Sequence, residues 1–232
     1  MIVMDLQGIL YVVATPIGNM GDITLRAIDI LKEVDIVVAE STPRALKLFN
    51  QHGIKKTIVS ISSYSEEKRS ASIIRGLKGG KNVALITSAG TPCISDPGGI
   101  LVSKCVEEGI EVCAVPGASA VAGLVSVSGL FADRFIFYGF LPLKKGKRKR
   151  ALEELSSFPY PIVFYESPRR IDETLGYVLA ILGDRRIVVV REMTKMYETT
   201  YRGTVSDVIE QIASEEKRGE YAFIVAGCGP KL

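Results

Sequence analysis

The sequence has few of the residues that most often bind metal ions. Its 232 residues include a single histidine, His52, and four cysteines, none of which form a Cys-x-x-Cys pair. A structural zinc site needs four nitrogen or sulfur ligands at short spacing, so we expect no metal. Scattered cysteines in a chain of this size are more typical of reduced core or loop positions than of a disulfide framework.

The chain also lacks the motifs of the common nucleotide-binding folds. Neither Gly-x-Gly-x-x-Gly nor Gly-x-x-x-x-Gly-Lys-Ser/Thr occurs, which argues against a nicotinamide oxidoreductase and against a P-loop NTPase. The most apolar stretch, 114–130, is interrupted by Pro116, Gly117 and Gly123, so we expect no membrane span. No basic segment followed by a long apolar run opens the chain, so we expect no signal peptide and a cytoplasmic protein.

Charge is nearly balanced along most of the chain but not in one segment. A net charge of +3 is too small to indicate a nucleic-acid binder from composition alone. Residues 144–150, however, read Lys-Lys-Gly-Lys-Arg-Lys-Arg. Such runs are usually solvated helix starts. Because this run follows a strand near a predicted domain boundary, we favour contact with RNA phosphates.

Short apolar segments alternate with helical patterns in the first half of the chain. Strands are expected over about 9–14, 35–39, 58–61, 82–86 and 111–115. Helices are expected over about 22–32 with Asp22 as N-cap, from about 42, over 66–77, up to about 108 and from about 118. Uninterrupted Val/Ile strands separated by helices indicate a mainly parallel sheet covered on both faces.

The alternation restarts near Asp133. Strands are expected over about 134–139, 162–165, 186–191 and 222–226, with an extended segment at 197–201. Helices are expected after the basic run, over about 168–182 and from Val205. We therefore predict two α/β domains, 1–132 and 133–232, the first with a mainly parallel sheet and the second with a mixed sheet.

Three loops that follow strands are rich in glycine, proline and small polar residues. They are Thr-Pro-Ile-Gly-Asn at 15–19, Thr-Ser-Ala-Gly-Thr-Pro at 87–92 and Pro-Gly-Ala-Ser at 116–119. Ligands of open α/β sheets bind beyond the carboxyl ends of strands, where small residues let them approach the backbone. A tight turn would explain any one of these loops, whereas three together predict a pocket.

These loops carry motifs that resemble the tetrapyrrole methylase superfamily, in its branch of small-subunit ribosomal RNA 2′-O-ribose methyltransferases acting on a cytidine. The matching segments also include Asp-Pro-Gly at 96–98, Gly-Phe-Leu-Pro at 139–142, Phe-Tyr-Glu-Ser at 164–167 and Arg-Glu with Thr-Lys at 191–195. The resemblance runs from about Leu10 to about Gly227. The order and spacing of the segments make it specific.

The resemblance implies that S-adenosylmethionine binds in a cleft between two α/β domains, in a homodimer. It also implies small-subunit ribosomal RNA, or the assembled small ribosomal subunit, as substrate. The residues implied to bind the methyl donor are Pro16, Ser88, Gly90, Thr91, Ile94, Ser119, Ala120, Tyr165 and Ala222.

Methyl transfer to a ribose hydroxyl needs alignment, which can supply roughly 7–11 kcal/mol, and a group that helps the hydroxyl lose its proton. The candidate catalytic residues are Glu40, Glu166, Glu192 and Lys195. Lys195 is a base only if its pKa is depressed, and otherwise a cation that stabilises the alkoxide. The sequence leaves this choice open. The candidate RNA-binding residues are Arg44, Lys144, Lys145, Lys147, Arg148, Arg170 and Arg191.

The chain departs from the family pattern at three places. Ser88 stands where the family usually has Asp, and a hydroxyl cannot supply the charge that pairs with a sulfonium. Residues 41–44 read Ser-Thr-Pro-Arg where the family has Asp-Thr-Arg, and the sequence ends at Leu232 where many relatives continue into a helical domain. Two alternatives therefore stay open: a tetrapyrrole C-methyltransferase, and a non-catalytic RNA-binding factor for ribosome assembly.

Overall fold

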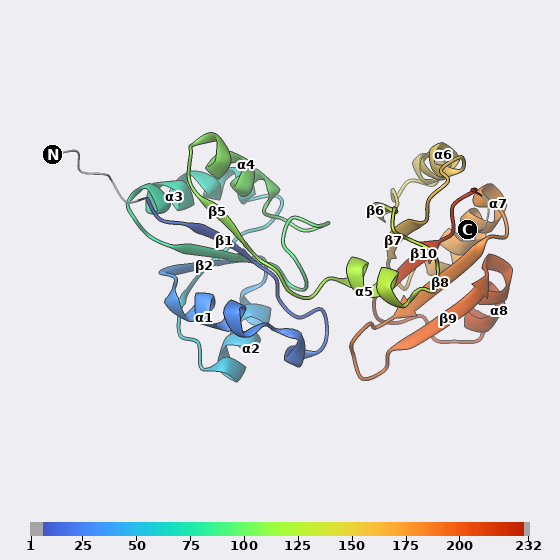
Figure 1. Ribbon diagram of the computed structural model, residues 1–232, viewed down its shortest axis with the longest axis horizontal. Coiled ribbons are helices and arrows are strands. Elements are labelled where there is room, and N and C mark those ends of the chain that lie inside the picture. The colour runs from blue at the N-terminus through green and yellow to red at the C-terminus, as the bar shows by residue number, and fades with distance from the viewer. Residues whose placement is uncertain (1–6, 230–232) are drawn as a thin grey trace. The chain divides into compact units, whose positions relative to one another are not determined.

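The computed structural model describes residues 7–229, which form two compact units (Figure 1). The first unit ends at Ser119 and the second begins at Ala120. Helix α5, Ala120–Val127, thus belongs to the second unit. The boundary between 132 and 133 that we inferred from the sequence stays a prediction.

The first unit contains a five-stranded parallel sheet, as predicted. Its strands lie in the order β3-β2-β4-β1-β5, and every neighbouring pair is parallel. The strands are β1 Leu10–Val13, β2 Ile36–Ala39, β3 Thr57–Ser60, β4 Val83–Ile86 and β5 Val112–Val115. All four residues of the central strand β4 are buried, because helices cover both faces of the sheet.

Two pairs of helices cover the two faces of this sheet (Figure 1). They are α1 Leu25–Glu33 and α2 Thr42–His52 on one face, and α3 Glu66–Lys78 and α4 Gly99–Glu107 on the other. Leu31 and Phe49 belong to the core under the first pair. Leu77 and Leu101 belong to the core under the second.

The start of α1 differs from the prediction. Asp22 is not the N-cap, because it lies in a short 3-10 turn, Met20–Asp22. Thr24 is the N-cap, and its hydroxyl accepts a hydrogen bond from the N–H of Ala27 at 3.1 Å. Thr24 stands three residues before Ala27, which is the spacing at which an N-cap side chain binds a backbone N–H of the first helical turn. The other helix start in this region, with Pro43 in the first turn of α2, is as predicted.

The second unit contains a mixed five-stranded sheet in the order β6-β7-β10-β8-β9. Its strands are β6 Ile136–Phe140, β7 Ile162–Glu166, β8 Arg186–Arg191, β9 Thr199–Thr204 and β10 Tyr221–Val225. Strands β6 and β7 are parallel and the remaining pairs are antiparallel, which confirms the mixed sheet. The edge strand β6 carries a bulge between Phe137 and Gly139.

Helices cover both faces of this sheet as well. The core on one face includes residues of α6 Lys145–Leu155, α7 Ile171–Leu182 and α8 Val205–Ala213. On the other face, Leu124 of α5 packs in a core with Val163 and Ile224. The basic run forms the first turns of α6. Among the described residues, no helix has the length and apolar character needed to cross a bilayer.

The chain connections of the first sheet define where a ligand can bind. After β1 the chain crosses to β2 through α1, and after β4 it crosses to β5 through α4 on the opposite face. β1 and β4 are neighbours, so the direction of winding reverses between them. This switch point lies at the carboxyl ends of both strands, where open α/β sheets bind ligands.

Candidate active site

The loops after β1 and β4 are joined directly at the switch point. The N–H of Thr15 donates to the carbonyl of Gly90 at 2.9 Å, and the N–H of Gly90 donates back to the carbonyl of Thr15 at 3.0 Å. The hydroxyl of Thr91 donates to the carbonyl of Ala118 in the third loop at 3.4 Å. The three loops singled out in the sequence therefore form one cluster.

Gly90 is needed for this close contact. Its φ of +75° lies in the left-handed region, and a Cβ on Gly90 would lie 3.3 Å from Cγ2 of Ile17. The absence of a side chain lets the two loops approach closely. The predicted donor contacts Pro16, Gly90 and Thr91 all lie in this cluster, and Ile94, which is 43% exposed, lies further along the same loop.

Glu40, at the end of β2, lies beside the loop after β4. Its carboxylate accepts a hydrogen bond from the N–H of Ser88 at 3.0 Å. The structure thus places the carboxylate of Glu40 next to the backbone of Ser88. Arg44, a predicted phosphate contact, is exposed on α2.

Glu66 is a polar residue of this region that the sequence did not single out. It is the first residue of α3, yet only 3% of it is exposed, and its carboxylate binds backbone N–H groups at the start of α4. An acid in the first turn of a helix is common, so nothing in the local pattern indicates that this one is buried.

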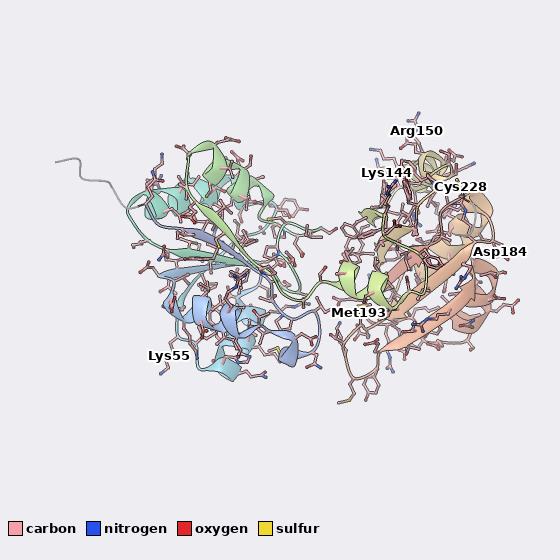
Figure 2. All side chains as sticks on the ribbon, in the orientation of Figure 1. Lys55, Lys144, Arg150, Asp184, Met193 and Cys228 are labelled. Carbon is pink, nitrogen blue, oxygen red and sulfur yellow. The ribbon has the colours of Figure 1, made fainter. Side chains whose placement is uncertain are left out.

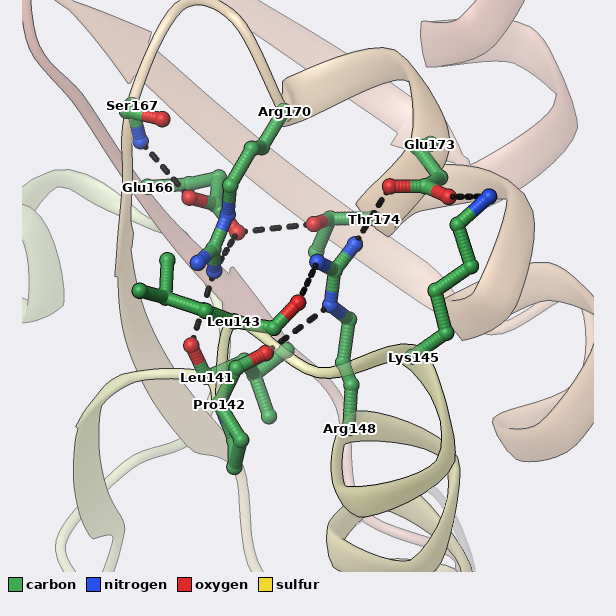
Figure 3. A network of polar contacts seen from close by, with 10 residues as sticks. All are labelled: Leu141, Pro142, Leu143, Lys145, Arg148, Glu166, Ser167, Arg170, Glu173 and Thr174. Atoms are coloured by element: carbon green, nitrogen blue, oxygen red, sulfur yellow. Dashed lines mark hydrogen bonds and ion pairs between the residues drawn. The ribbon is translucent and has the colours of Figure 1, made fainter.

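In the second unit, Glu166 is enclosed by hydrogen-bond donors. Only 2% of Glu166 is exposed. The N–H of Ser167 donates to Oε1 at 2.7 Å, and the guanidinium of Arg170 and the hydroxyl of Thr174 donate to Oε2 at 2.8 and 2.7 Å (Figure 3). Arg170 also donates to the carbonyl of Leu141 at 2.8 Å. These contacts suit a carboxylate that orients Arg170, which in turn holds the backbone at Leu141.

Arg148 is the second clamp on that loop. Its guanidinium donates to the carbonyls of Pro142 and Leu143 at 3.1 Å each and to Glu173 at 2.8 Å (Figure 3). The residue is 2% exposed. Lys145 reaches the other oxygen of Glu173 at 2.9 Å, and these two cations hold the pKa of the Glu173 carboxyl below its usual range. Arg148 and Arg170, both predicted to bind RNA, are thus engaged with the protein.

Glu192 and Lys195 lie together in the loop between β8 and β9. Lys195 Nζ is 2.8 Å from Glu192 Oε1 and 2.8 Å from Glu220 Oε2. Burial lowers the pKa of Lys195, but the hydrogen bonds to both carboxylates outweigh it and the pKa is raised. Lys195 is therefore a cation at neutral pH rather than a base.

The remaining predicted residues lie on the second sheet or where the chain passes from one unit to the next. Tyr165 and Ala222 are register partners on β7 and β10, and the Tyr165 ring lies 5.1 Å from that of Phe137. Ser119 is the last residue of the first unit, and Ala120 begins α5. Arg191 on β8 donates to Glu215 at 2.6 Å and to Thr199 at 3.1 Å.

Comparison with known proteins identifies the family. A family model described as tetrapyrrole (corrin/porphyrin) methylases matches residues 9–209. The chain belongs to the tetrapyrrole methylase family. This confirms the resemblance inferred from the loop motifs.

Relatives within the family place the chain in its ribosomal RNA methyltransferase branch. A ribosomal RNA small subunit methyltransferase I from Thermotoga maritima is 46% identical over 95% of this chain and 99% of its own length. The protein of the same name from Bacillus subtilis is 45% identical over 95% of this chain and 76% of its own length.

Solved structures of the tetrapyrrole methylase family share the fold. The uroporphyrin III C-methyltransferase of Thermus thermophilus superposes with a TM-score of 0.67 at 20% identity, over 94% of this chain and 97% of that chain. At this identity the likeness shows the fold alone. Together with the parallel and the mixed sheet described above, it confirms the predicted fold class.

The clamp by Arg148 leads to a prediction about stability. Replacing Arg148 with Met removes the buried guanidinium that binds the carbonyls of Pro142 and Leu143 and the carboxylate of Glu173, and we expect the free energy of unfolding to fall by about 2–3 kcal/mol. Lys149→Met is the control, because Lys149 is exposed and its ion pair with Glu153 is long, at 3.8 Å. We expect its free energy of unfolding to change by no more than about 0.5 kcal/mol. Chemical denaturation measures both, and equal effects would rule out the clamp.

Proposed function

We propose that this chain is a methyltransferase that uses S-adenosylmethionine and transfers the methyl group to a ribose 2′-hydroxyl of a cytidine in small-subunit ribosomal RNA. The observation that carries the proposal is the identity of 46% to a ribosomal RNA small subunit methyltransferase I over 99% of that relative's length. Likeness to C-methyltransferases of tetrapyrroles is far weaker in sequence, at 20% identity. We further propose a cytoplasmic homodimer that acts on the RNA or on the assembled subunit.

The residues of the first unit fit a sulfonium donor. The loops after β1, β4 and β5 meet at the switch point, and loops at the ends of parallel strands supply N–H and C=O groups to ligands. The carboxylate of Glu40, held against Ser88, provides a negative charge beside the same loop. A carboxylate beside this loop favours a cationic ligand such as a sulfonium. When bound, the donor supplies an electrophilic methyl group.

Proposed roles follow for the polar residues of the second unit. Glu166 and Arg170 hold the loop at 141–143, so that the basic start of α6 has a fixed position. Lys195 remains protonated, and we propose that its charge stabilises the oxygen that loses its proton during methyl transfer. Glu192 keeps Lys195 in place through its own hydrogen bond.

The exposed part of the basic run is the proposed RNA contact. Lys144, just before α6, and Lys147 and Arg150 within it are exposed, and Figure 2 labels Lys144 and Arg150. Their charges supply affinity for phosphates that does not depend on base sequence. Arg148 supports this surface from within rather than binding RNA itself.

Donor binding and methyl transfer test the proposed function. Calorimetric titration with S-adenosylmethionine should show micromolar binding, whereas NADH should not bind. Small ribosomal subunits from a strain without this modification should then accept the radiolabelled methyl group from the donor. The phosphodiester bond that follows the labelled nucleotide should resist alkaline cleavage, because its 2′-hydroxyl is methylated. Binding of RNA without any donor binding would instead support a non-catalytic ribosome-assembly factor.

The basic surface leads to a second prediction. The double variant Lys144→Ser/Arg150→Ser should bind small-subunit RNA more weakly, because fewer phosphates are neutralised. The slope of log Kd against log salt should fall by about one for each phosphate that the variant no longer neutralises. The matched control is Lys55→Ser/Arg75→Ser, which removes two exposed positive charges from the first unit (Figure 2 labels Lys55). Equal salt dependence in the two double variants would contradict the assignment of this surface.

A further inference from the structure

Glu66 joins two helices that are distant in the sequence. Its Oε1 accepts hydrogen bonds from the N–H groups of Gly98 at 3.1 Å, Ile100 at 2.8 Å and Leu101 at 3.0 Å. These N–H groups lie at the start of α4, and Glu66 lies at the start of α3. One buried carboxylate oxygen therefore satisfies three backbone donors of another helix.

This contact is favourable for two physical reasons. The first N–H groups of a helix have no partner within the helix, and α4 has Gly98 as its N-cap, which has no side chain to satisfy them. A negative charge at this end also interacts favourably with the helix dipole. Removing the carboxylate would leave three backbone donors without this partner, two of them, Gly98 and Leu101, in buried positions.

The segment that Glu66 fixes has an unusual backbone conformation. Cys93 and Ser95 have φ values of +70° and +63°, although neither is glycine. Gly98 has a φ of +126°, and a Cβ there would lie 2.6 Å from Leu85 Cδ2 and 2.9 Å from Cys93 Sγ. Such conformations persist only where surrounding contacts hold them, and they are frequent at ligand sites.

The loop after β4 is thus held at both ends. At its start, Gly90 is bound to Thr15 by two backbone hydrogen bonds. At its end, Gly98 is bound to Glu66. Between these points lie Thr91 and Ile94, which are proposed to contact the methyl donor.

We propose that Glu66 is a positioning residue that holds the loop at 90–98 in the conformation that binds the methyl donor. This inference rests on the proposed function of the loop. Glu66 acts through the backbone of Gly98 and the start of α4 and does not touch the donor. Its substitution should therefore weaken donor affinity through the mobility of the loop.

The experiment compares Glu66→Gln and Glu66→Ala with a control on the same helix, Ser70→Ala. Ser70 is also buried, and its hydroxyl donates to the main-chain carbonyl of Glu66 at 2.7 Å, so its removal affects α3 but not the loop. Three quantities are measured for each variant: the unfolding midpoint, amide hydrogen exchange across 87–101, and the Kd for S-adenosylmethionine by calorimetry. The Gln variant keeps an acceptor oxygen and the side-chain size, so it tests the charge if the Ala variant does not fold.

We expect exchange at Gly98, Ile100 and Leu101 to accelerate in both Glu66 variants, and Kd to rise by about tenfold in Glu66→Ala and less in Glu66→Gln. Ser70→Ala should change the unfolding midpoint but neither exchange in the loop nor Kd. Unchanged amide exchange in the Glu66 variants overturns the inference. It is also overturned if Ser70→Ala raises Kd as much as the Glu66 variants do for the same loss of unfolding midpoint. If the unaltered protein does not bind the donor, the proposed function fails instead, and with it the link between the loop and the donor.

Discussion

The pair of backbone hydrogen bonds between Thr15 and Gly90 is the contact on which the first unit's site depends. It joins the loops of two neighbouring strands from which the chain departs toward opposite sides of the sheet. Because backbone groups make the contact, it fixes the conformation of the two loops without requiring a particular side chain at Thr15. Gly90 has a positive φ and lies against Ile17, and the buried strand β4 leads directly into its loop, so the two loops have few other ways to pack.

Much of this fold can be predicted from the sequence, because apolar strands and helix signals are local. The element order and both sheet types follow from such patterns. The N-cap at Thr24 was missed because Asp22 is an equally good capping residue two positions earlier, and only the three-dimensional course of the chain distinguishes them. The three strand-end loops were recognised because glycine and proline mark turns regardless of tertiary context.

The charged residues of the site were harder to predict. Arg148 lies in a run of seven residues with the pattern of a solvated surface, yet it is 2% exposed, whereas its neighbours in the run are exposed. Glu66 has the pattern of an ordinary acid in the first turn of a helix, and Glu166 was predicted from its place at a strand end to be catalytic, but both are enclosed by donors. The partners of Glu66 lie more than thirty residues away, whereas most partners of Arg148 and Glu166 lie within eight residues but on other elements. Burial of a charge therefore depends on how the chain folds around it, which the local pattern does not record.

The bulge in β6 has a consequence for how the second sheet meets other chains. Edge strands expose N–H and C=O groups that can pair with a strand of another molecule. The register shift between Phe137 and Gly139 disturbs the regular spacing of these groups, and bulges increase the local twist of a strand. The irregular spacing makes the open side of β6 a poorer template for a strand of a second molecule than a regular edge strand would be.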